Sequence, residues 1–114
     1  MKRRTRKLQF SRKEKEKVLN RDYGRCIFCE KGGFTMCEDD FQHEIKDIMH
    51  FVPKSAGGLG IEQNGAVGCR YHHSLLDNGS RGMRKQMLVY FEKYLKSQYP
   101  DWNKEELVFK KYSF

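Results

Sequence analysis

The 114-residue sequence contains no long apolar run. A membrane-spanning helix needs about 20 consecutive, mostly apolar residues, and no stretch of this chain comes near that length. The beginning of the chain also lacks the apolar segment of a secretory signal peptide, because residues 1–7 are nearly all basic. We therefore expect no membrane partner and a protein that stays in a reducing compartment.

Apolar residues are scarce overall: they make up 38% of the chain, and the mean hydropathy is −0.87. A single domain of this length with so little apolar content has a modest core, which a metal ion would help to hold together. The chain has four cysteines. In a reducing compartment, cysteines favour a metal site over disulfides.

Positive charge is abundant and unevenly placed. Residues 1–17 hold nine Lys or Arg against two Glu, a local charge of +7 within a total of +8. Such a segment neutralises phosphates and gains affinity by releasing counterions, although a solubilising tail or a localisation signal has the same composition. The basic residues expected to contact nucleic acid are Lys2, Arg3, Arg4, Arg6, Lys7, Arg12 and Lys13, with Lys54 from a later loop.

Local patterns predict an α+β chain. After a basic arm at residues 1–10, expected to be disordered, Ser11 and Glu14 favour a capped helix that ends before Gly24. Further elements are expected as a strand at 45–52, a glycine-rich loop at 54–60, a return strand at 66–67, a helix at 70–78 and an amphipathic helix from 83 to before Pro100. We expect residues 11–80 to form the core domain and residues 81–114 a helical extension.

Two pairs of metal-type ligands bracket the middle of the chain. Cys26-x-x-Cys29 and Cys69-x-x-His72 each offer two corners of a tetrahedral site. Bound zinc would tie residue 26 to residue 69 and close a long loop. Cys37 could replace His72 as the fourth ligand or be a free thiol, and the repeated two-residue spacer favours His72. A redox Cys-x-x-Cys is disfavoured, because the pair follows a predicted helix instead of a strand.

Three residues between and beside these pairs predict reactivity. His50, at the end of the predicted strand, titrates near neutrality and can take a proton from water. His73 directly follows His72, so on a helix the two imidazoles face different directions. Asp77 lies four residues beyond His73, the spacing by which one helical face presents two ligands to a metal. His43 is expected to be an ordinary surface histidine.

These residues together resemble the HNH nucleases. The resemblance covers about residues 20–79 and rests on Cys26-x-x-Cys29, His50-Phe51-Val52-Pro53-Lys54-Ser55-x-Gly57-Gly58, Asn64-Gly65 and Cys69-x-x-His72-His73. The chain is most similar to small phage-type members that have a structural zinc. The resemblance implies a ββα-metal core, flanked here by an N-terminal helix and by C-terminal helices. It also implies a bacterial host cytoplasm as the location and a phage packaging terminase as a possible partner.

The resemblance assigns a role to each matching residue. His50 would be the general base that activates water, and Asn64 would brace the loop and orient His50. His73 would bind one catalytic divalent metal (Mg²⁺, Mn²⁺, Ni²⁺ or Zn²⁺), which stabilises the transition state. Many members carry Asp or His immediately before the base, where this chain has Met49, a poor ligand for a hard cation. Asp77 could compensate; Asp47, about 10 Å from His50 along a strand, is a weaker candidate.

The sequence therefore predicts a metal-dependent endonuclease or nickase that hydrolyses DNA phosphodiester bonds. The resemblance implies that cleavage leaves a 5′-phosphate and a 3′-hydroxyl. A monomer is the simplest assumption for a single site. The alternative is a zinc-stabilised module that binds nucleic acid without cleaving it, having lost the second metal through Met49. An RNA-cleaving version also fits, because the phosphate chemistry is shared.

Overall fold

The computed structural model describes residues 3–34, 40–79 and 82–110. Its helices are α1 (Arg3–Leu8), α2 (Arg12–Asp22), α3 (Ile27–Lys31), α4 (Asp40–Glu44), α5 (Arg70–Asn78) and α6 (Arg84–Gln98), and its strands are β1 (Lys46–His50) and β2 (Gly65–Cys69). Lys2 and Cys37 lie outside the described residues, as do the side chains of Arg3 and Arg4. Among the described helices, none is long and apolar enough to cross a membrane.

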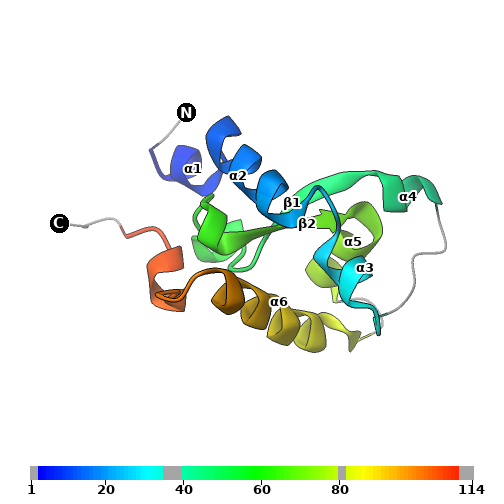
Figure 1. Ribbon diagram of the computed structural model, residues 1–114. Coiled ribbons are helices and arrows are strands. Elements are labelled where there is room, and N and C mark those ends of the chain that lie inside the picture. The colour runs from blue at the N-terminus through cyan, green and yellow to red at the C-terminus, as the bar shows by residue number, and fades with distance from the viewer. Residues whose placement is uncertain (1–2, 35–39, 80–81, 111–114) are drawn as a thin grey trace.

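The two strands form an antiparallel pair at the centre of the molecule (Figure 1). Met49 lies opposite Ala66, and His50 lies opposite Gly65. All five residues of β2 are buried, which explains why its sequence reads as a short run of small and apolar residues. Helix α5 begins at the residue after β2, so the order strand, loop, strand, helix predicted for residues 45–78 is confirmed.

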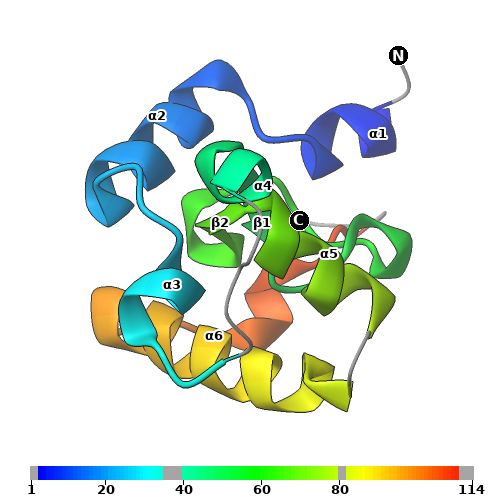
Figure 2. The ribbon, with the colours of Figure 1, turned by 90° about the vertical axis from the view of Figure 1, so that its right-hand side faces the viewer.

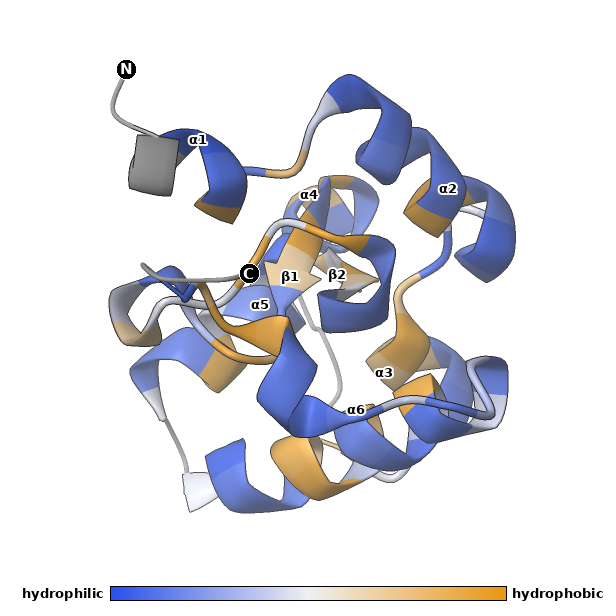
Figure 3. Ribbon diagram, turned by 90° about the vertical axis from the view of Figure 1, so that its left-hand side faces the viewer, coloured by the Kyte–Doolittle hydropathy of each residue, from blue (hydrophilic) through white to orange (hydrophobic). Residues whose placement is uncertain are grey.

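Helices α2 and α6 lie on opposite sides of this strand pair (Figures 1 and 2). Met87, Phe91 and Leu95 repeat at helical spacing along α6 and are fully buried. They share one core cluster with Phe28 of α3 and Met49 of β1. Hydrophobic segments lie in both strands and in α3, and they alternate with hydrophilic ones along α6, whereas α2 is mostly hydrophilic (Figure 3). The predicted C-terminal extension is thus part of the same core.

Within the basic arm, which was expected to be disordered, residues 3–8 form helix α1. The arm is anchored at its end: Leu8 is 4% exposed, and the backbone N–H of Gly60 donates to the carbonyl of Lys7 over 3.0 Å. The sequence did not indicate this helix, because residues 1–7 are nearly all basic and the residues that anchor the arm lie some 50 positions downstream.

Helix α2 ends in a buried ion pair that joins three elements. Arg21 and Asp22 pair at 2.7 Å, and both side chains are largely buried. Asp22 also accepts hydrogen bonds from the backbone N–H of Val67 at 2.9 Å and from the hydroxyl of Tyr94. Arg21 donates to the carbonyl of Gly65 over 2.7 Å. This pair fixes α2 against β2 and α6, because each buried charge finds its partners there.

Candidate functional site

The two ligand pairs, Cys26 with Cys29 and Cys69 with His72, lie at the starts of two short helices. Cys26 is the N-cap of α3, and its Sγ accepts from the backbone N–H of Cys29 at 3.5 Å. Cys69 is the N-cap of α5 and accepts in the same way from the backbone N–H of His72, also at 3.5 Å. The unpaired amides at a helix start favour a negative thiolate. The x-x spacer therefore places the second ligand of each pair in the first turn of a helix.

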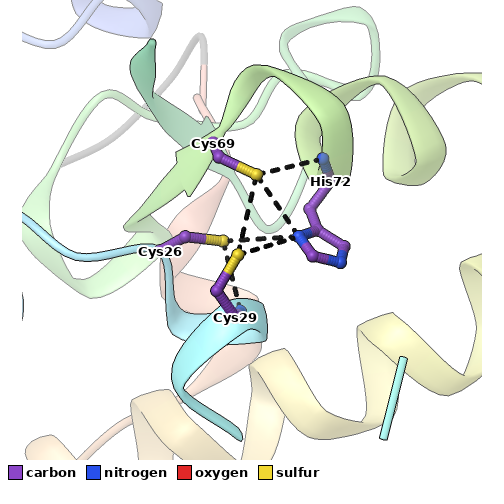
Figure 4. A group of neighbouring side chains, drawn as sticks. All are labelled: Cys26, Cys29, Cys69 and His72. Atoms are coloured by element: carbon purple, nitrogen blue, oxygen red, sulfur yellow. Dashed lines mark hydrogen bonds between the residues drawn. The ribbon is translucent and has the colours of Figure 1, made fainter. Parts of the chain in front are cut away.

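The four side chains point toward a common centre (Figure 4). His72 Nδ1 lies 3.7, 3.4 and 3.3 Å from the Sγ atoms of Cys26, Cys29 and Cys69, and the Sγ atoms of Cys29 and Cys69 are 3.8 Å apart. A tetrahedral zinc with bonds of about 2.3 Å to sulfur and about 2.0 Å to nitrogen separates its ligand atoms by about 3.5–3.8 Å. The observed spacings match these edges.

The thiols of this cluster influence one another. A hydrogen bond from Cys69 lowers the pKa of Cys26, whereas the same bond, together with burial, raises the pKa of Cys69 to about 11. Of these two thiols, Cys26 therefore loses its proton first. A bound cation removes the remaining protons, because it is the thiolate that ligates metal.

Cys26, Cys29, Cys69 and His72 can thus hold a zinc ion, as predicted. Within the described part of the chain, theirs is the one group of three or more Cys, His, Asp or Glu side chains that gathers ligand atoms in this way. Cys37, the alternative fourth ligand, lies outside that part. The expectation for His43 was wrong: its Nδ1 lies 3.5 Å from Cys29 Sγ. No spacing in the sequence indicates this contact, since it depends on where α4 packs.

His50 lies at the end of β1 and is half-buried. Its Nε2 is 2.8 Å from the carbonyl oxygen of Leu8, and its ring packs on the Phe10 ring with the centroids 4.4 Å apart. Burial lowers the pKa of His50, and the charge of Lys54 adds to this, although the Leu8 carbonyl acts in the opposite direction. The imidazole is therefore neutral near pH 7, as a general base must be.

Asn64 is fully buried and clamps the loop that follows His50. Its Oδ1 accepts from the backbone N–H of Val52 at 2.8 Å. Its Nδ2 donates to the carbonyls of Val52 and Leu59 over 3.1 and 2.8 Å. Its own carbonyl accepts from the N–H of Phe51 at 2.9 Å. Asn64 therefore fixes the backbone immediately after His50.

His73 lies between two carboxylates. Its Nδ1 is 2.9 Å from Asp47 Oδ2, and its Nε2 is 3.1 Å from Asp77 Oδ2. Asp47, the weaker ligand candidate from the sequence, contacts His73 because α5 packs against β1. Arg70 also pairs with Asp47, at 2.9 and 3.1 Å, and this hydrogen bond lowers the pKa of Asp47, with His73 contributing in the same direction.

Met49 is fully buried in the core, so its thioether does not compete for a cation. The Sδ atom would lie 2.2 Å from a Cβ placed on Gly68, a measure of how tightly the position is packed. A ligand at residue 49 is therefore incompatible with this core, and the acidic groups near His73 come from Asp47 and Asp77 instead.

His50, Asp47, His73 and Asp77 line one open cleft of about 1280 Å³. Of the residues predicted to bind nucleic acid, Lys54 also lines it, while Arg6, Lys7, Arg12 and Lys13 are exposed. Lys15, from the basic segment 1–17, lines it as well. Three further basic residues of the cleft had not been assigned from sequence: Lys46, Arg70 and Arg84. They are scattered along the chain, so only the fold gathers them.

Searches against protein-family models, curated proteins and solved structures find no match to this chain.

Proposed function

We propose that the protein is a metal-dependent HNH endonuclease or nickase that hydrolyses DNA phosphodiester bonds. The proposal rests on one observation: a single cleft contains the imidazole of His50, which is neutral near pH 7, and the side chain of His73 with the carboxylates of Asp47 and Asp77. Base and cation ligands on one surface are what hydrolysis of a phosphodiester requires. The basic residues around the cleft suit a polyanionic substrate.

The local architecture supports the HNH assignment. The antiparallel strands β1 and β2 are followed at once by α5, the order of a ββα-metal core. His50 ends the first strand, Asn64 precedes the second, and His73 lies in the helix, as the motif requires. The Cys₃His group at the start of α3 and α5 then takes the structural zinc of such a core.

The described side chains divide the work as follows. His50 takes a proton from water, which then attacks phosphorus in line with the departing 3′ oxygen. Asn64 holds the backbone after His50 and thereby limits the positions of the imidazole. Lys54, Arg70 and the neighbouring basic residues bind the phosphates of the DNA strand. Such contacts position the DNA without reading its sequence.

His73 and Asp77 would hold the catalytic cation, since imidazole and carboxylate suit Mg²⁺, Mn²⁺, Ni²⁺ or Zn²⁺. When bound, the cation supplies stabilisation of the charge that develops on the phosphate and on the leaving oxygen. Asp77 is the more available carboxylate, with 59% of its side chain exposed, whereas Asp47 is engaged by Arg70. Asp47 would receive the remaining N–H of His73, as carboxylates commonly do beside metal-bound histidines.

One observation favours a second function, a zinc-stabilised module that binds nucleic acid without cutting it. Among the described residues the Cys₃His group alone is preassembled for a metal, while each nitrogen of His73 is already paired with a carboxylate. In this reading the cleft and its basic rim only bind. The two functions differ in whether a divalent ion other than the zinc engages His73 and Asp77.

Nicking of supercoiled plasmid DNA tests the proposal. The intact protein and His50→Ala are compared with added Mg²⁺, Mn²⁺ or Ni²⁺. Val89→Ala, at an exposed position on α6, is the control outside the cleft, and zinc content is measured for all three. We expect metal-dependent nicking that falls by a factor of about 10² to 10⁴ in His50→Ala and persists in Val89→Ala.

One result would overturn the nuclease assignment, and another would overturn the role of His50. Intact protein that retards DNA on a gel but nicks it with none of the ions supports the binding module. Nicking that survives in His50→Ala with unchanged zinc content removes His50 as the base. A parallel reaction with a single-stranded RNA of the same sequence distinguishes a DNA enzyme from an RNA enzyme.

A further inference from the structure

The segment Lys7–Phe10, here called the strap, lies against the imidazole of His50, the candidate general base. The Leu8 carbonyl contacts His50 Nε2 at 2.8 Å, and the Phe10 ring packs against the same imidazole in a tilted arrangement. A carbonyl oxygen can only accept, so Nε2 carries the proton and donates it. The lone pair of neutral His50 then lies on Nδ1. The strap therefore fixes both the orientation and the tautomer of this histidine.

Two glycines allow the strap to sit this closely. A Cβ on Gly60 would lie 2.3 Å from the backbone carbonyl carbon and oxygen of Gln9. A Cβ on Gly65 would lie 2.6 Å from the Phe10 ring. Real side chains do not tolerate such distances, so any larger residue at either position moves the strap or the loop. The loop is the firmer of the two, since Asn64 and the carbonyl of Leu107 hold Leu59 beside Gly60.

We propose that the strap is a positioning element of the catalytic apparatus, holding His50 in the tautomer with the proton on Nε2 so that Nδ1 receives the proton of water. The catalytic part of this inference rests on the proposed nuclease function; the hold on the tautomer does not. The role differs from that of a basic arm that only supplies affinity, because here the backbone of Leu8 and the ring of Phe10 act, and neither is charged.

The placement of the strap also links substrate binding to the base. Arg6 and Lys7 are exposed and directly precede the residues that touch His50. Gln9 and Phe10 themselves line the cleft with His50 and Lys54. DNA phosphates that bind the side chains of Arg6 and Lys7 would therefore contact the same short segment that orients the imidazole of His50. Binding of the backbone and alignment of His50 are therefore coupled through four residues.

Gly60→Ala tests the inference in the full-length chain, since it displaces the strap without altering a charge or a cleft side chain. Two measurements are made: the single-turnover nicking rate at saturating DNA, and the ¹⁵N chemical shifts of the His50 ring above its pKa. We expect the saturating rate to fall at least about tenfold, because small misplacements of a reacting group are costly. Half-saturation should change less than about twofold.

The ring nitrogens report the tautomer directly. Wild-type His50 should show the proton on Nε2, and Gly60→Ala should show a mixture of tautomers. Phe10→Leu, which keeps an apolar side chain on the strap but removes the ring contact, serves if Gly60→Ala fails to fold, and we expect the same changes in smaller degree. Val89→Ala, at an exposed position on α6, is the control with unchanged rate and shifts.

Distinct results overturn the two proposals. A wild-type His50 protonated on Nδ1, or a folded Gly60→Ala that keeps both the tautomer and the saturating rate, removes the strap as a positioning element. A rise in half-saturation alone would reduce the strap to a binding arm. Failure of the wild type to nick with any divalent ion overturns the nuclease instead, and the ring shifts still decide whether the strap holds His50.

Discussion

Asn64 shows at the residue scale how one side chain can hold a loop. It is buried and makes three hydrogen bonds to backbone groups of Val52 and Leu59. Asn64→Ala would leave these groups without partners away from water, so we expect unfolding to become easier by about 3 kcal/mol. Chemical denaturation followed by circular dichroism measures this. Asn20→Ala, at an exposed position, should change stability by less than about 0.5 kcal/mol.

A loss near zero for Asn64→Ala would show that water replaces these bonds and that the loop is not clamped. If Asn64→Ala is folded in the absence of denaturant, its nicking rate can also be measured. There we expect a lower rate, because the backbone after His50 is no longer fixed.

The pH dependence of nicking should report the environment of His50. Burial lowers its pKa below the ordinary value of 6.5. The base must be neutral, so the rate is full above this pKa and is lost as the pH falls through it. We therefore expect the acidic limb of the single-turnover rate to have its midpoint below about 6.5. A midpoint above that value would contradict a buried, neutral His50.

At the scale of elements, the zinc group joins α3 to α5. These helices begin 43 residues apart and have only five and nine residues, too few to be stable by themselves. Removal of zinc by a chelator should therefore lower the Tm by at least about 20 °C, which thermal circular dichroism measures. Added zinc should restore it. Cys69→Ser should resemble the stripped protein, and an unchanged Tm in both would show that the group is not structural.

Elements with strong local signals could be predicted from sequence, and the others could not. Helix α5 was expected at residues 70–78 and occupies Arg70–Asn78, because Gly79 supplies the left-handed residue that ends it. Helix α2 follows its cap, with the N–H of Glu14 donating to Ser11 Oγ at 3.2 Å. Helices α1, α3 and α4 were missed, since each has only five or six residues and depends on distant partners.

The candidate site divides in the same way. The four zinc ligands were found because their spacing is local and repeated. The pairing of His73 with Asp47, the contact of His43 with Cys29 and the strap over His50 were not found. Each joins segments that only the packing of helices brings together, and none has a spacing rule that sequence could reveal.

At the scale of the whole molecule, Asp22 is the residue on which three elements meet. It pairs with Arg21 and accepts from Val67 and Tyr94. Asp22→Ala would leave Arg21 charged and buried without this partner, so we expect a loss of about 3–5 kcal/mol. Urea unfolding followed by the fluorescence of Trp102, the one tryptophan of the chain, measures it. Asp101→Ala, at an exposed turn, should leave the midpoint unchanged, and equal midpoints for both variants would show that the buried pair contributes nothing.

The shared core of β1, α3 and α6 also determines which parts of the molecule can open separately. Phe28, Met49 and Phe91 belong to one cluster, so α6 cannot detach without exposing the interior of the strand pair. Amide hydrogens of β2 and α6 should then exchange with deuterium in one slow, global event. Helix α1, held mainly by Leu8 and its neighbours, can lift away by itself. His50 would thus lose and regain its contacts with Leu8 and Phe10 many times before the core unfolds once.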